Sequence, residues 1–338
     1  KMANVAHKGT FAAYNGASLN EIFYEPVFRS DDIMRNYRVI PNVKHKMNVY
    51  TSAALTKIVQ PYTTCSATSG STQFNIDDKV ITAGRCRVAL EQCTDEFFGT
   101  YIEEMYRSGV DVMNIEGTQL ADAIVNRAVR GIQSDVVRLA WGAALSPVEA
   151  GYTVFDGWME LMGADATVLA ARDTLTSAAA IPTSAQAMTG IRTVFDGAPA
   201  ALQQVPAADK KMFVTPQVYN KYLEELEENG SNLGLVNLQD GVPKAHFRGV
   251  ELVPMYEWDT IVADTNPVIF TIGVNGRTNG ICYCAKDNLV IGSDTTDPSS
   301  EFKVFYDDLE EKMFLRAYFK LGVQFLYPSL VQWGIFDG

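Results

Sequence analysis

The sequence predicts an α+β protein whose parts follow one another along the chain. A polar N-terminal segment leads into a strand-rich hairpin around 64–84, and one long amphipathic helix follows at 118–144. A compact α/β region and a strand-rich closing segment complete the chain. Of the 338 residues, 47% are hydrophobic and only 20% are charged, which supplies a core but little charge for a fully solvated surface. We therefore expect part of the surface to be buried between subunits.

Residues 1–45 predict an extended arm. They are polar and rich in Asn, and the segment has too little apolar surface to fold alone. Such a segment is most useful when it lies across a neighbouring subunit. We expect Arg29, Arg35 and Arg38 to contact carboxylates there. After the arm, the partial alternation from Met47 to Gln60 indicates a strand or a short helix.

The segment around 64–84 predicts an extended β-hairpin. Strand-like segments at 62–66 and 74–81 flank the small residues of 67–72, which are typical of a turn. The hairpin is polar on both faces near its tip, so it has no core of its own and needs a partner. The residues that we expect to contact a neighbouring subunit are Phe74, Lys79 and Arg85.

The helix at 118–144 is the strongest periodic feature of the sequence. Its apolar stripe recurs with helical period and comprises Leu120, Ile124, Ala128, Ile132, Val136, Leu139 and Ala143. At 1.5 Å per residue the helix is about 40 Å long. Gly131 and Gly142 weaken an isolated helix by about 1 kcal/mol each, so packing must stabilise it. A shorter amphipathic helix is predicted at 95–108.

The rest of the chain predicts alternating helices and strands, followed by paired strands. Pro216 at a first helical position and the Asn-Gly pairs at 275–276 and 279–280 mark the boundaries. The predicted elements are a strand or turn at 152–158, helices at 184–195 and 217–229, and strands at 212–215, 250–255, 268–274 and 281–285. Strands at 302–307 and 312–328 should pair around a turn at 308–311.

Motifs that carry chemistry are absent from the sequence. The three histidines lie far apart, without cysteines or carboxylates at metal-ligand spacing, and no glycine-rich phosphate loop occurs. We therefore expect no enzyme, no cofactor and no metal site. The five cysteines predict reduced thiols, with Cys282 and Cys284 as small core residues. The enzymatic alternative is a cytosolic thiol hydrolase that uses Cys86 or Cys284 with His246.

Charge and hydropathy exclude two further classes of function. The net charge of -12 argues against nucleic-acid binding as the main activity, because neutralising a phosphate backbone requires clustered Lys and Arg. We expect the protein to enclose nucleic acid rather than to bind it tightly. No apolar run approaches the roughly 18 residues that span a bilayer, so we expect a soluble protein without a membrane partner.

The order of these parts resembles the major capsid proteins of tailed bacteriophages, the Hong Kong 97 (HK97) fold. The most specific stretches are Asp287–Asp294, Phe302–Tyr306 and Phe314–Gln324, which resemble the closing strands of that family. The resemblance implies an N-arm, an E-loop hairpin, a long spine helix, an α/β axial domain and a strand-rich peripheral domain. The corresponding ranges are 1–58 for the arm, 59–94 for the E-loop, 95–147 for the peripheral domain with its spine helix, 148–285 for the axial domain and 286–338 for the closing peripheral strands.

The resemblance also implies a function. It predicts a structural protein that assembles into hexamers and pentamers of an icosahedral shell around double-stranded DNA, in the virion capsid and built in the host bacterial cytoplasm. The implied partners are other copies of the chain, the portal, scaffold and decoration proteins of the same virion, and DNA enclosed without sequence-specific binding. An encapsulin-type shell and another structural protein of the virion remain alternatives. No crosslink is assigned to Lys79.

Overall fold

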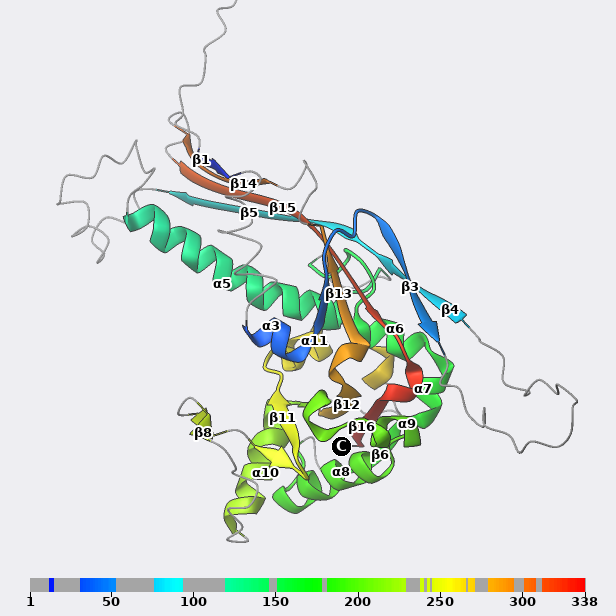
Figure 1. Ribbon diagram of the computed structural model, residues 1–338. Helices are drawn as coiled ribbons and strands as arrows, with labels where there is room; N and C mark the ends of the chain where they lie inside the picture. Colours follow the sequence, from blue (N-terminus) through cyan, green and yellow to red (C-terminus); the bar gives the residue numbers. More distant parts are fainter. Residues whose placement is uncertain are drawn as a thin grey trace, which may run out of the picture.

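Two six-stranded sheets and one long helix organise the chain (Figure 1). The computed structural model describes residues 12–14, 31–52, 76–93, 119–145, 151–177, 181–228, 238–239, 242–243, 245–265, 267–270, 279–294, 301–307 and 312–337. The predicted strand at 62–66 and the predicted helix at 95–108 lie outside these residues.

The long sheet is built around β15 (Lys312–Phe325). Its strand order is β1-β14-β15-β13-β2, and β5 also pairs with β15. The other strands are β1 (Ala12–Tyr14), β14 (Glu301–Asp307), β13 (Leu289–Ser293), β2 (Arg38–Ile40) and β5 (Gly84–Cys93). Strands β14 and β15 pair antiparallel from Glu301↔Tyr318 to Asp307↔Lys312, which confirms the predicted pairing of the closing strands.

The predicted long helix is confirmed as α5 (Gln119–Gly142). Figure 1 shows it running along β5 and β15, and its 24 residues make it about 36 Å long. Within the stripe, Ile132 and Val136 are 3% and 0% exposed, and they share a core with Leu315 and Phe319 of β15. The helix therefore supports one face of the long sheet.

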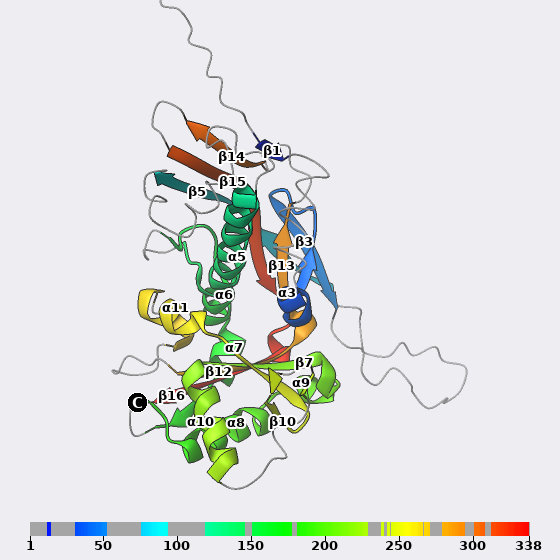
Figure 2. The ribbon, with the colours of Figure 1, turned by 90° about the vertical axis from the view of Figure 1, so that its left-hand side faces the viewer.

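The second sheet, which we call the lobe sheet, lies between two layers of helices (Figure 2). Its order is β10 (His246–Phe247), β11 (Val250–Pro254), β7 (Lys210–Val214), β12 (Gly280–Ala285), β16 (Val331–Asp337) and β6 (Asp173–Thr176). Met212 and Ile281 face the core beneath α8 (Ser184–Asp196) and α10 (Pro216–Glu228), whereas Phe213 and Cys282 face the core shared with α5. Because side chains alternate along a strand, both faces of this sheet are apolar.

The helices of the lobe follow their sequence signals. Thr183 and Gln186 form a capping box at the start of α8, and Pro216 begins α10 as predicted. Shorter helices that the sequence did not single out are α3 (Asp31–Asn36), α6 (Trp158–Ala164), α7 (Ala166–Ala171), α9 (Ala200–Gln204) and α11 (Glu257–Thr265). These short helices depend on tertiary packing, because few turns carry little periodic pattern.

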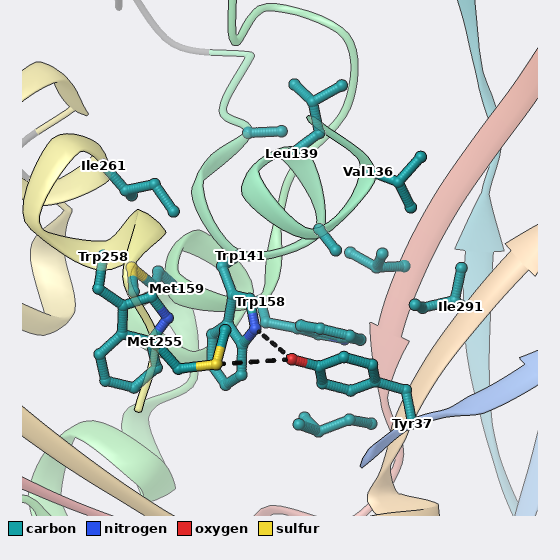
Figure 3. Close-up of a cluster of buried hydrophobic side chains, with 14 of the residues drawn as sticks. Tyr37, Val136, Leu139, Trp141, Trp158, Met159, Met255, Trp258, Ile261 and Ile291 are labelled. Atoms are coloured by element: carbon teal, nitrogen blue, oxygen red, sulfur yellow. Dashed lines mark hydrogen bonds between the residues drawn. The ribbon is translucent and has the colours of Figure 1, made fainter. Parts of the chain in front are cut away.

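Aromatic side chains fill the junction between α5, the segment around Tyr37 and the lobe sheet (Figure 3). We call this set the junction cluster: Tyr37, Trp141, Trp158, Phe213, Trp258 and Trp333. The ring centroids of Trp141 lie 5.0 Å from Trp158 and 4.9 Å from Trp258, both edge to face. The indole Nε1 of Trp141 donates to the hydroxyl of Tyr37 at 2.9 Å, and that hydroxyl donates to the sulfur of Met255 at 3.9 Å. The polar atoms of both rings are thus satisfied within the core.

The prediction of a coreless arm is wrong for its second half. Ile33 and Tyr37 belong to the main core and are only 2% and 3% exposed, and Val43 is buried in a separate small core. Strand β2 also pairs with β13 in parallel, from Arg38↔Val290 to Ile40↔Gly292. The few apolar residues of this segment are sufficient to hold it against the protein, because each joins a core that other segments supply.

Two boundary predictions around residues 268–280 are also wrong. Residues Val268–Phe270 form a 3-10 helix, whereas a strand was predicted to begin there. The amide of Phe270 donates to the carbonyl of Pro267 at 2.9 Å, which is the hydrogen bond of such a turn. Asn279–Gly280 is no turn, because Asn279 is buried and accepts a hydrogen bond from Thr215 at 2.9 Å. Residues 271–278 lie outside the described part of the chain.

The closing segment is divided between the two sheets. Strands β13, β14 and β15 lie in the long sheet, whereas β16 pairs antiparallel with β12 and parallel with β6 in the lobe sheet. The chain therefore returns to the lobe after the 3-10 turn Pro328–Leu330. The expected peripheral range 286–338 covers elements of both sheets.

Gly142 is predicted to be required by the close approach of α5 to α11. A Cβ atom at Gly142 would lie 2.5 Å from Cγ2 of buried Ile261, a β-branched side chain with little freedom to move. Gly142→Ala should therefore destabilise the protein by about 1–3 kcal/mol in thermal or denaturant unfolding. Gly131→Ala is the matched control, because nothing lies within 4 Å of its added atom, and it should stabilise by up to about 1 kcal/mol. A Gly142→Ala protein as stable as the parent would contradict this packing.

A second prediction concerns the ion pairs of Glu251 on β11. Its carboxylate pairs with Lys211, and with Arg35 of α3 at 2.5 Å. Burial raises the pKa of Glu251, but the hydrogen bonds and charges of Lys211 and Arg35 outweigh burial and hold the pKa below its ordinary value. A lowered pKa stabilises the fold above the unfolded-state value, and this contribution is lost as the pH falls through the folded-state value.

Arg35→Gln should therefore lower the free energy of unfolding by about 1 kcal/mol at neutral pH, and the difference from the parent should shrink below about pH 4. Urea unfolding of both proteins, from neutral pH to below about pH 4, measures this difference in the free energy of unfolding. Arg192→Gln, on the exposed side of α8, is the control and should track the parent at every pH. A deficit in Arg35→Gln that does not change with pH would show that the pair with Glu251 is not its cause.

Candidate assembly site

The hairpin is formed by β3 (Lys46–Ser52) and β4 (Ile76–Thr82). They pair antiparallel from Lys46↔Thr82 to Ser52↔Ile76, so the first strand begins before residue 59, where the hairpin was predicted to start. The strand alternative for 47–60 is confirmed over 47–52. The turn proposed at 67–72 lies outside the described residues. Both strands continue directly into the body of the protein, β4 through Ala83 into β5.

One face of this hairpin packs on the long sheet. Ile81 is fully buried in a small core with Val43, Val290 and Leu326, and Val49 packs against that core. The side-chain amide of Gln324 also donates to the carbonyl of Val80 at 2.9 Å. The base of the hairpin is therefore held by its own subunit, which corrects the expectation that only a partner stabilises it.

The other face of the hairpin, which we call its outward face, presents apolar side chains to solvent. Tyr50 is 72% exposed, Ile76 64% and Val80 37%, and all three project to the side opposite Ile81. Asn48 and Asp78 share this face and are joined by a hydrogen bond of 3.1 Å. Scattered exposed apolar residues are normal, but three on one short hairpin form a surface suited to contact with protein.

The predicted contact residues are spread over the surface and do not form one cluster. Arg29 and Phe74 lie outside the described residues. Arg38 on β2 and Arg85 on β5 are exposed, and within the described part of the chain neither forms an ion pair. These two remain candidates for contact with a neighbour.

Arg35 and Lys79 instead have partners in their own chain. Arg35 binds Glu251, and Lys79 lies 3.8 Å from Asp165 and 4.9 Å from the ring centroid of Phe325. Contact of these two side chains with a neighbouring subunit stays a prediction. The sequence does not reveal these partners, because Arg35 and Glu251 lie 216 positions apart. The exposed Tyr50 was missed because it lies before residue 59, outside the predicted hairpin, and Ile76 was missed because the hairpin was expected to be polar near its tip.

The thiols of the enzymatic alternative lie in apolar surroundings. Cys86, on β5, is buried, and burial raises its pKa to about 12. Cys282 and Cys284 are fully buried in the main core, as predicted, and burial raises the pKa of Cys282 well above its ordinary value. A nucleophilic cysteine requires a thiolate, which the surroundings of Cys86 and Cys282 disfavour. His246 lies on β10, in the lobe sheet, whereas Cys86 lies in the long sheet.

Other features of a small-molecule site are weak over the described residues. A cavity of about 310 Å³ between β6 and α8 is lined mostly by Thr, Ala and Gly side chains, together with Leu175 and Gln186, and no titratable group lines it. In the same part of the chain, no three His, Cys, Asp or Glu side chains are placed to hold a metal ion. None of the described helices is both long and apolar enough to cross a membrane.

Comparison with known proteins finds likeness in structure but not in sequence. No family model matches the chain, and no curated protein matches it. Among solved structures, a chain of the satellite phage P4 procapsid including the size determination (Sid) protein matches with a TM-score of 0.53 and 9% identity, over 93% of this chain and 98% of that chain. A chain of the capsid of Myoviridae phage XM1 matches with a TM-score of 0.54 and 10% identity, over 90% and 91% of the two chains.

An encapsulin also matches, with less similarity. The SrpI encapsulin complex from Synechococcus elongatus PCC 7942 has a TM-score of 0.48 and 11% identity, over 90% of this chain and 86% of that chain. This score is too low to favour that class. The two phage capsid chains match over more than nine-tenths of their own lengths. The chain therefore has the fold of phage capsid proteins.

Proposed function

We propose that this chain is a major capsid protein that assembles into an icosahedral shell. The observation that carries the proposal is the likeness in fold to phage capsid chains across nine-tenths or more of the sequence. A fold alone does not establish function, so the features of the surface must agree with it. The outward face of the hairpin and the low proportion of charged residues both favour a protein that buries surface between copies.

The parts of the HK97 fold are assigned here as part of the same proposal. The hairpin of β3 and β4 corresponds to the E-loop, α5 to the spine helix, and the long sheet to the peripheral domain. The lobe sheet with α8 and α10 corresponds to the axial domain, to which β16 also belongs. With these assignments the hairpin projects from the side of the long sheet (Figure 1), where it is available to an adjacent subunit.

The proposed role requires heterologous contacts that close into a shell. Repeated contacts of one surface with a different surface on the next copy generate rings, and curved shells need such contacts in several directions. Other copies of the chain are therefore the principal partners. Portal, scaffold and decoration proteins and the enclosed DNA are further partners that a virion of this kind would require, with assembly in the host cytoplasm.

A catalytic role receives little support from the same residues. The proposal assigns Cys86, Cys282 and Cys284 to packing, because all three are buried and burial raises the pKa of Cys86 and Cys282, which opposes formation of a thiolate at these two. The net charge of -12 also suits a container, since a wall that bound DNA tightly would hinder packaging and release.

Electron microscopy of the purified protein tests the proposal. Rings or closed shells in negative-stain images are the expected result. Particles of single-subunit size under all conditions of salt and concentration, including those with a scaffold protein supplied, would contradict it.

The outward face of the hairpin is predicted to be required for assembly but not for folding. Tyr50→Asp with Ile76→Asp places charges on a face that is already exposed, so the free energy of unfolding of the subunit should change by less than about 1 kcal/mol. The same charges should abolish shells, because burying an unpaired carboxylate at an interface costs several kcal/mol. Thermal melting of the subunit and electron microscopy measure the two effects.

The matched control for this pair is Ser134→Asp with Ala201→Asp, which adds the same charge at exposed positions of α5 and α9. The control should assemble like the parent. Normal shells from the Tyr50 and Ile76 variant would show that the outward face is not an interface.

A further inference from the structure

The two faces of the long sheet differ in chemistry. On β15, Leu315, Ala317 and Phe319 are buried, and they belong to the core that includes the α5 stripe. Their neighbours Arg316, Tyr318 and Lys320 alternate with them and therefore project from the opposite face of the sheet. At one end this opposite face is covered by the hairpin, where Thr82 and Ala83 approach Gly322 closely. The remainder carries polar and aromatic side chains.

Basic side chains gather on this face. We call it the basic face, and its charged members with described side chains are Arg85, Arg87, Lys312, Arg316 and Lys320, with Glu91. The register of β5 against β15 sets Arg85 directly opposite Lys320, Arg87 opposite Tyr318, and Ala89 opposite Arg316. Directly opposed side chains on one face of a sheet are nearest neighbours, so these charges act on one another.

Two carboxylates near this face pair with its lysines, and the register of β14 against β15 sets two more acidic residues, Glu301 and Asp307, opposite Tyr318 and Lys312. Lys312 lies 3.7 Å from Glu91, and Lys320 lies 3.9 Å from the fully buried Asp294. Arg85 and Arg87 are both exposed, and neither forms an ion pair with another described residue. Arg316 lies over the ring of Phe314, 5.6 Å from its centroid. Arg85 and Arg87 are thus a local excess of positive charge.

This excess is unfavourable for the isolated subunit. Like charges that face each other across two strands destabilise the pair, as Arg85 and Lys320 do here. The chain as a whole has 40 acidic residues and only 28 basic ones. Because five of the basic residues lie on one face, the rest of the surface is more acidic than the average. A second copy of the chain therefore carries the complementary charge.

We propose that the basic face binds a carboxylate-bearing surface of a second copy of this chain, with Arg85 and Arg87 as the main contacts. This inference rests on the proposed function, because only an assembling protein brings copies together in this way. Complementary charges across an interface favour the correct register and exclude like-charged surfaces. Nucleic acid is the less favoured occupant, since two exposed arginines in a strongly acidic chain neutralise few phosphates.

Salt-dependent dissociation of assembled particles tests the proposal. The test variant is Arg85→Gln with Arg87→Gln, and the matched control is Arg127→Gln with Arg192→Gln, which removes two exposed charges from α5 and α8. Light scattering follows particle size during a titration with NaCl. Because salt screens contacts of this kind, the test variant should dissociate at about half the salt concentration that the parent and the control require.

Further variants and measurements keep the outcome clear. Arg85→Lys with Arg87→Lys retains both charges and should regain most of the salt tolerance of the parent. Melting temperatures of the dissociated subunits should agree among all variants, because the substituted side chains are exposed. If the parent forms particles and the Gln variant dissociates at the same salt concentration, the inference fails while the proposed function stands.

A second measurement distinguishes the occupants. Fluorescence anisotropy with a labelled 30-base-pair DNA duplex at 50 mM NaCl should show equally weak binding by the dissociated parent and the Gln variant. Binding by the parent that the Gln variant loses would overturn the assignment to a second copy. A parent that never forms particles would contradict the proposed function itself.

Discussion

The fold depends on the burial of the junction cluster. All four tryptophans of the chain are fully buried in it, and they come from α5, α6, α11 and β16. Aromatic side chains of this size dominate core energetics, and edge-to-face pairs add to the area that they bury. The cluster joins the end of α5 to the lobe sheet, so it fixes where the long sheet lies relative to the lobe. Tyr37 brings the N-terminal segment into the same core through its hydrogen bond with Trp141.

This constraint explains which surfaces remain for other copies. The helices α5 and α11 approach so closely that only a glycine fits at position 142, and the lobe sheet is covered on both faces. The long sheet is covered on one face by α5, and the hairpin covers only part of the other. The outward face of the hairpin and the basic face therefore remain as surfaces of distinct chemistry, one apolar and one positively charged.

The sequence predicted those parts of the fold whose signals are local. The stripe of α5, the start of α10 at Pro216, and the pairing of β14 with β15 across a short turn each depend on residues close together in the chain. The sequence did not identify the strand that pairs with β4, because that strand, β3, lies before residue 59 and so outside the predicted hairpin. Likewise, the local periodicity of β16 predicts a strand but does not indicate which of the two sheets the strand joins.

The candidate site was less predictable than the fold, for the same physical reason. Charge and residue type mark Arg35, Lys79 and Arg85 alike as polar surface residues. Only the folded chain shows that Arg35 reaches Glu251 and that Lys79 reaches Asp165, while Arg85 remains exposed beside Lys320. The exposure of Tyr50 and Ile76 also depends on the register of β3 with β4, which decides the face on which each side chain lies.

Hydrogen exchange, compared between dissociated subunits and assembled particles, tests most directly whether the hairpin and the junction have the separate roles assigned here. A two-stranded hairpin held on one face opens locally more often than a packed core. The amides of 46–52 and 76–82 should therefore exchange quickly in subunits and become protected in particles, whereas those of α5 near Trp141 should be protected in both. Equal protection of the hairpin in the two states would contradict the account.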